Sequence, residues 1–227
     1  MRRVILVALF VICASAVLMA QPKRPVAKPT PTPTPAPLFV DKGGIDGKTY
    51  TNQALNFSIT FPVTWLIPND DFEDYMKKEG FDLTLRAPDS MSMAERARVN
   101  QSLKNVEMLV TAYRTIPGSD QNAIMRVSVE DLKPNPQIKD AVDYFDAIRN
   151  SFKAMRLPAD FMYSQTKAEK LGEKQFAFLD VSSTAGKKRM YATVRHGYAI
   201  LFTLTYSLDQ DLETMRQVLA DGNFKLN

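Results

Sequence analysis

An alternating Thr-Pro tract near the N-terminus restricts where this chain can fold. Residues 21–37 hold seven of the fourteen prolines, and Thr alternates with Pro from Pro29 to Pro35. Proline has no backbone N–H to donate, and its ring fixes φ, so neither a helix nor a sheet ladder forms there. The pattern is typical of an extended polyproline II spacer with a rise of about 3.1 Å per residue. A ligand for an aromatic groove is the alternative interpretation.

The residues before this tract have the pattern of a secretory signal peptide. Arg2 and Arg3 precede an uncharged apolar run of 17 residues, from Val4 to Ala20, that ends in small side chains. We expect cleavage after Ala20, with a site after Ala16 as the alternative, and export to the periplasm, the cell surface or the medium. An uncleaved anchor over residues 4–20 is the alternative, because 17 apolar residues are at the short limit for a bilayer of about 30 Å.

The composition excludes several classes of protein. With one Cys and one His, the chain has neither a disulfide framework nor a Cys/His zinc module. Five of its 29 basic residues precede residue 38, and removing them leaves 24 basic against 25 acidic residues. A nearly neutral domain gives no electrostatic reason to bind nucleic acid. We expect membrane contact only through an uncleaved N-terminal segment.

Residues 38–227, which follow the proline-rich tract, number 190 and are long enough for one domain with a single core. We expect residues 1–20 to be the signal peptide or anchor, and residues 21–49 to be the linker. The linker includes a flexible lead-in that contains Gly43, Gly44 and Gly47. The domain itself spans residues 50–227.

Periodicity predicts strands that alternate with helices in this domain. The expected strands are residues 57–61, 82–87, 107–114, 123–130, 174–183, 189–195 and 198–206, and the expected helices are residues 70–79, 92–103, 136–156 and 207–221. Asn135 is the expected cap of the third helix, and its apolar stripe is Ile138, Val142, Phe145, Ile148, Phe152 and Met155. Ser207 and Gln210 are expected to open the last helix.

The last three strands form a meander, with turns expected at residues 185–186 and 196–197. In the final strand Tyr198, Ile200, Phe202, Leu204 and Tyr206 alternate with smaller residues, which predicts a central strand beneath a helix. The sequence therefore predicts a single-domain α+β fold, an antiparallel β-sheet flanked by helices that share one side.

Two stretches resemble the PsbP-like family. The first holds Tyr50, Asn52, Phe57, Ser58, Ile59, Phe61, Pro62 and Trp65, and the second is residues 188–224. The resemblance implies an α/β/α sandwich around an antiparallel sheet, in a family whose members act by binding rather than catalysis. Plant members are extrinsic subunits of the oxygen-evolving photosystem. Their contacts are not transferred to this chain, because the Thr-Pro tract replaces the N-terminal segment that they use.

The sequence predicts no catalytic, cofactor-binding or metal-binding residue. His196, the single His, lies in a tight connection, which favours a turn role over a Ser-His-Asp triad. Asp71, Glu73 and Asp74 near a helix start are explained by the helix dipole rather than by a cation. The run of Asp209, Asp211 and Glu213 lacks the central Gly and the twelfth ligand of a calcium loop.

The predicted function is a non-enzymatic exported binding or assembly module on a proline-rich stalk, with a protein or envelope component as partner. The alternative is a carrier of a small apolar ligand or lipid, with adaptable methionines around it: Met91, Met93, Met108, Met125 and Met190. A third possibility is a hydrolase with an unrecognised site. Trp65 and Tyr198, the first residues to test, are expected to be structural.

Overall fold

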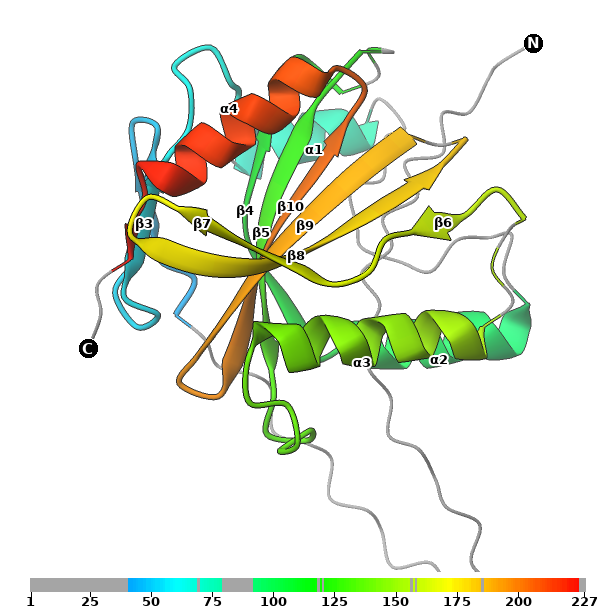
Figure 1. The fold of residues 1–227 in the computed structure, drawn as a ribbon. Helices are drawn as coiled ribbons and strands as arrows, with labels where there is room; N and C mark the ends of the chain where they lie inside the picture. Colours follow the sequence, from blue (N-terminus) through cyan, green and yellow to red (C-terminus); the bar gives the residue numbers. More distant parts are fainter. Residues whose placement is uncertain are drawn as a thin grey trace, which may run out of the picture.

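The computed structural model describes residues 41–68, 70–78, 92–117, 119, 121–155, 157, 159–184 and 186–224. Within them the chain forms two antiparallel sheets and four helices (Figure 1), which confirms the predicted α+β class. Residues 1–40 and the strand predicted over residues 82–87 lie outside the described residues. None of the helices in the described part is long and apolar enough to span a membrane.

The larger sheet carries most of the predicted strands. Its order is β4 (Val106–Tyr113), β5 (Ile124–Asp131), β10 (Tyr198–Tyr206), β9 (Gly186–Arg195), β8 (Lys174–Ser183) and β6 (Met162–Tyr163), and β7 (Lys167–Leu171) also pairs with β8. The strand over residues 198–206 lies between β5 and β9, so its predicted central place is confirmed. The short strands β6 and β7 were not predicted.

The smaller sheet includes residues 44–49, which the sequence analysis expected to be a flexible lead-in. Its strands are β1 (Gly44–Asp46), β2 (Thr49–Asn52), β3 (Phe57–Thr60) and β11 (Asn223–Phe224), in that order. Asp46 pairs with Thr49, so Gly47 and Lys48 form a two-residue turn, and the positive φ of Gly47 (57°) suits it. Regular structure therefore begins before residue 50.

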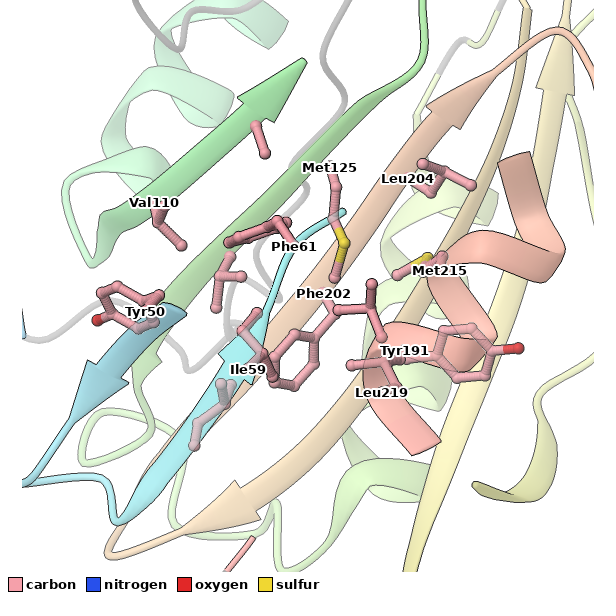
Figure 2. Packing of buried hydrophobic residues seen from close by; sticks show 14 of the residues in the cluster. Tyr50, Ile59, Phe61, Val110, Met125, Tyr191, Phe202, Leu204, Met215 and Leu219 are labelled. Atoms are coloured by element: carbon pink, nitrogen blue, oxygen red, sulfur yellow. The ribbon is translucent and has the colours of Figure 1, made fainter. Parts of the chain in front are cut away.

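One core lies between the larger sheet, the smaller sheet and α4 (Asp209–Ala220), as Figure 2 shows. Phe57, Ile59 and Phe61 are at most 3% exposed, which confirms the alternation seen in the sequence. Trp65 is buried in the same core, and Tyr198 packs against it. Phe202 has no exposed surface, and its ring lies 5.7–5.9 Å from the rings of Phe57, Phe176 and Phe224.

A second core lies on the opposite face of the larger sheet, under α3 (Ala141–Ala154). It contains Leu179, Ala192 and Leu201, whose side chains alternate with those of the first core. The helices α3 and α4 therefore cover opposite faces (Figure 1), and the expectation that the helices share one side is wrong. Both faces of β10 are apolar, so another element must shield each face from water. The remaining helices are α1 (Asp70–Lys78) and α2 (Met93–Leu103).

Two helix starts differ from the prediction. Asp140, not Asn135, caps α3, and its Oδ1 accepts the backbone N–H groups of Val142 and Asp143 at 2.8 and 2.9 Å. The predicted first turn is instead a loop in which the Asn135 carbonyl accepts the N–H of Ile138. Val142 is 43% exposed, and the buried residues of α3 are Tyr144, Phe145, Ile148 and Phe152. The N-cap of α4 is Leu208, not Ser207, and it makes no side-chain capping bond.

The hairpin turns lie where the sequence placed them or one residue away. Arg195 pairs with Tyr198, and the intervening His196 and Gly197 have φ values of 51° and 78°. Two successive positive φ values define a type I′ turn, so the turn role predicted for His196 is confirmed. In the preceding hairpin Gly186 pairs with Ser183, which places Gly186 in the strand rather than in the turn.

Candidate functional site

The acidic residues considered for a calcium site do not converge. Each faces a different basic group: Asp209 lies 3.1 Å from Lys187, Asp211 lies 3.2 Å from Arg114, and Glu213 lies 3.0 Å from Arg216. Burial raises the pKa of Asp211, whereas the charge of Arg114 opposes that shift. On α1, Asp71 and Asp74 are exposed. Over the described ranges, no cluster of three His, Cys, Asp or Glu side chains is placed to hold a metal ion.

The methionines considered for an apolar ligand lie in different places. Met125 belongs to the core under α4, whereas Met190 belongs to the core under α3. Met93 is 80% exposed and Met108 is half-buried, while Met91 lies outside the described residues. These four side chains therefore do not surround one common space.

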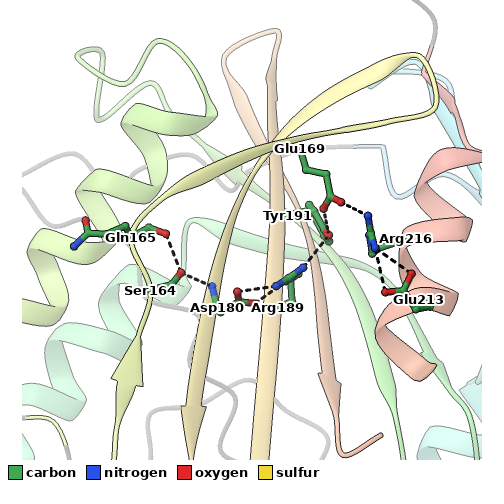
Figure 3. Close-up of polar contacts among 8 residues, drawn as sticks. All are labelled: Ser164, Gln165, Glu169, Asp180, Arg189, Tyr191, Glu213 and Arg216. Carbon is green, nitrogen blue, oxygen red and sulfur yellow. Dashed lines mark hydrogen bonds and ion pairs between the residues drawn. The ribbon is translucent and has the colours of Figure 1, made fainter. Parts of the chain in front are cut away.

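A chain of charged contacts joins the larger sheet to α4 (Figure 3), and we call it the Arg189 network. Arg189 on β9 donates to Asp180 on β8 through Nε at 2.6 Å and Nη2 at 2.7 Å. Its guanidinium carbon lies 4.4 Å from the ring centre of Phe178. Burial lowers the pKa of Arg189, but the hydrogen bonds with Asp180 and Tyr191 outweigh it and raise that pKa above its ordinary value.

The Arg189 network continues from the core to the surface. The Tyr191 hydroxyl donates to Glu169 Oε2 at 2.6 Å, and Glu169 Oε1 accepts a hydrogen bond from Arg216. Arg216 Nη1 also donates to Glu213 at 3.0 Å. Burial and the hydrogen bond to Glu169 raise the pKa of Tyr191. Charges of alternating sign are thereby held at fixed positions on three strands and one helix.

At the other end of this network, Ser164 connects the chain before β7 to β8. The backbone N–H of Asp180 donates to Ser164 Oγ at 3.0 Å, and the hydroxyl donates to the Gln165 carbonyl at 2.8 Å (Figure 3). Asp180 is thus fixed through its backbone as well as its carboxylate. The network positions charge, and each of these groups has a partner.

The opposite face of the same sheet carries polar side chains that are buried. On β5, Arg126, Ser128 and Glu130 alternate with core residues, yet they are only 7%, 3% and 2% exposed. Arg126 lies opposite Thr203 on β10, and Lys188 on β9 lies opposite Thr205, the next residue of β10 on this face. Arg126, Lys188, Thr203 and Thr205 form what we call the buried basic cluster.

Burial lowers the pKa values of both cations in this cluster. Burial, with the nearby charge of Arg126, lowers the pKa of Lys188 to about 7. Burial also lowers the pKa of Arg126, opposed by the neighbouring Tyr113. Arg126 Nη1 and Thr205 Oγ1 are buried and have no hydrogen-bond partner among the residues that the structure describes. Polar atoms of this kind are rare in folded proteins.

Sequence reasoning recognised the strand but gave these polar residues no role. In an antiparallel strand, alternation of polar with apolar side chains normally indicates a face turned to water. Only the second apolar face of β10 and the amphipathic α3 signalled that this face is covered. The Arg189 network was also missed, because its members come from four elements far apart in sequence.

Comparisons with known proteins give a distant likeness. No family model and no curated protein matches the chain. The solution structure of cyanobacterial PsbP from Synechocystis sp. PCC 6803 is similar over 84% of this chain and 100% of that chain, with 13% identity and a TM-score of 0.44. A crystal structure from Bacteroides thetaiotaomicron VPI-5482 is similar over 81% of this chain, with 13% identity and a TM-score of 0.39. The match covers only 50% of that Bacteroides chain.

Neither likeness is close enough to carry an argument about partners or activity. The α+β arrangement therefore rests on the strands and helices themselves. Membership of the PsbP-like family stays a prediction from the residues quoted above.

Proposed function

We propose that this chain is a non-enzymatic, exported binding module of the PsbP-like type. The stalk over residues 21–37 holds its domain away from the N-terminal signal or anchor. Its partner is a protein of the envelope or the extracellular space. Export is supported by the basic start, the apolar run and the small residues before Gln21.

The observation that carries the binding proposal is the outward end of the Arg189 network. Glu169, Lys187, Asp209, Glu213 and Arg216 form what we call the α4 charged surface. Asp209 and Glu213 have side chains 86% and 67% exposed, and Lys187 is 54% exposed, so their charges face the solvent. A partner's charges can replace the present ion pairs here at little desolvation cost.

The α4 charged surface is also held in place before binding. Arg216 is oriented by both Glu169 and Glu213, and Glu169 is oriented by the buried Tyr191. The apolar side of α4 anchors the helix to the core through Met215 and Leu219. Pre-ordered charges lower the entropy cost of association and select a partner of complementary pattern.

The test is isolation of the full chain, expressed with its own N-terminal segment, after chemical crosslinking in intact cells. Three samples are compared: the wild type, Arg216→Glu in the α4 charged surface, and Lys153→Glu on the exposed side of α3. The proposal predicts one stoichiometric envelope protein with the wild type and Lys153→Glu, and its loss with Arg216→Glu. Equal recovery of that envelope protein with both variants would show that the α4 charged surface does not bind it.

A further inference from the structure

We propose that a hollow on the smaller sheet binds an uncharged, N-acetylated glycan and holds the acetamido group of one of its sugars. The hollow lies at the end of the β2–β3 hairpin, where the turn between these strands comes next to β11. It shares no residue with the α4 charged surface. The inference is therefore independent of the function proposed above.

Three residues of the hollow belong to the face of the smaller sheet that points away from the core. Thr51 lies opposite Ser58, and Ser58 lies opposite Asn223, so the three form one row across β2, β3 and β11. In the next row Thr49 lies opposite Thr60, and their hydroxyl oxygens are 2.9 Å apart. We call these five residues the outer face. It presents hydroxyl and amide groups side by side, because the alternate residues of β2 and β3 are buried.

The lack of charge selects the class of ligand. Among the described residues that line the hollow, none carries a charged side chain. Asp46, opposite Thr49, adds a carboxylate at the far edge of the outer face, beside the turn between β1 and β2. An ionised ligand would lose hydration in the hollow without gaining an opposite charge. A neutral glycan gives up less hydration, and its hydroxyl and amide groups find both donors and acceptors there.

Size and chemistry indicate which part of the glycan enters the hollow. Its volume is about 220 Å³ and is open to solvent, below the roughly 300–1,000 Å³ of sites that enclose a whole ligand. One substituent therefore enters, while the sugar ring lies along the outer face. Gln53 and Asn223 line the hollow and are exposed. A side-chain amide donates and accepts hydrogen bonds, and an acetamido group has the matching carbonyl and N–H.

The end of the β2–β3 hairpin is fixed before binding. Asn52 has no exposed surface, and its amide donates to the Asp41 carbonyl at 2.7 Å and accepts the backbone N–H of Leu55 at 2.8 Å. The Asn56 carbonyl accepts a hydrogen bond from Arg195 Nη1 at 3.1 Å, which joins the turn to β9. A fixed backbone lowers the entropy cost of association. The few hydrogen bonds of one sugar therefore suffice for measurable binding.

The experiment compares two tetrasaccharides with the same backbone. Chitotetraose carries an acetamido group on each sugar, whereas cellotetraose carries a hydroxyl at that position. Each is titrated into the isotopically labelled full chain, and the side-chain amide signals of Gln53 and Asn223 are followed by NMR. The proposal predicts saturable shifts of both signals with chitotetraose and none with cellotetraose at the same concentration. Equal shifts with the two sugars, or no shifts with chitotetraose, would overturn it.

Variants that change one amide to an acid test the two exposed residues. Gln53→Glu and Asn223→Asp keep the shape of the side chain but remove its N–H donors, and both should fold because both positions are exposed. Each should weaken chitotetraose binding by about three- to tenfold, the scale of one hydrogen bond. Gln210→Glu on α4 is the matched control, and it should bind like the wild type, as should Arg216→Glu in the α4 charged surface. Wild-type affinity in both Gln53→Glu and Asn223→Asp would refute the site.

Discussion

Asp180 and Arg189 lie directly opposite each other on β8 and β9 and are joined by two hydrogen bonds of 2.6 and 2.7 Å. The Arg189 guanidinium also packs over the ring of Phe178, two residues from Asp180 on the same face. One side chain therefore joins a carboxylate, an aromatic ring and, through Tyr191, the helix α4. This pair therefore supports Tyr191, which in turn orients Glu169 in the α4 charged surface.

Arg189→Lys keeps the positive charge but removes the paired donors and the flat surface that stacks on Phe178. We expect the free energy of unfolding to fall by about 1–2 kcal/mol, the scale of one charged hydrogen bond and one cation–π contact. Urea unfolding, followed by fluorescence, measures this change. In a double-mutant cycle with Asp180→Asn, a coupling energy near zero would show that the pair contributes nothing.

Phe202→Ala removes a ring that has no exposed surface and that contacts three other rings. The cavity and the lost burial should lower the free energy of unfolding by about 3–5 kcal/mol. Val142→Ala on α3 is the matched control, because Val142 is 43% exposed. Similar urea midpoints for the two variants would contradict the assignment of Phe202 to the centre of the core.

Gly197→Ala tests the type I′ turn. Gly197 has a φ of 78°, and an added Cβ would meet no atom within 4 Å, so the only cost is backbone strain of about 1 kcal/mol. His196→Asn should be neutral or slightly stabilising, because Asn tolerates positive φ. Thermal unfolding of both variants measures these effects. A large loss of stability in His196→Asn would show that the imidazole does more than form the turn.

The lowered pKa of Lys188 predicts that the free energy of unfolding rises with pH. Its pKa is about 7 in the folded chain and has the ordinary value of 10.5 when unfolded, so between these values the unfolded state binds more protons. The free energy of unfolding should therefore increase from pH 7.5 to pH 9.5, by at most about 1.4 kcal/mol per pH unit. Urea unfolding in chloride buffers measures the slope. Lys188→Met should flatten it, and an unchanged slope in that variant would assign the titration to another group.

Much of the fold follows from short-range patterns in the sequence. In β10, large side chains at every second position specify both the strand and its central place, because period-two alternation needs no distant information. The His196-Gly197 turn is equally local. The start of α3 was misplaced because Asn135 followed by Pro136 fits the N-terminal preferences of a helix as well as Asp140 does.

The two polar clusters depend on tertiary packing and could not be read from such patterns. Arg126 and Lys188 lie on strands separated by β10, and only the sheet order places them near each other. Their burial could not be predicted either, because polar side chains that alternate with apolar ones normally indicate a face turned to water. The contact of Glu169 with Tyr191 and Arg216 likewise joins residues 22 and 47 positions apart.

The most direct test of the binding proposal is the affinity of the crosslinked partner for the purified full chain, measured by calorimetry at low and at physiological salt. The account predicts that Arg216→Glu weakens binding by at least about tenfold, or 1.4 kcal/mol, and that higher salt weakens the wild type. Lys153→Glu should bind like the wild type. Equal affinities for all three chains, independent of salt, would contradict a binding function carried by the α4 charged surface.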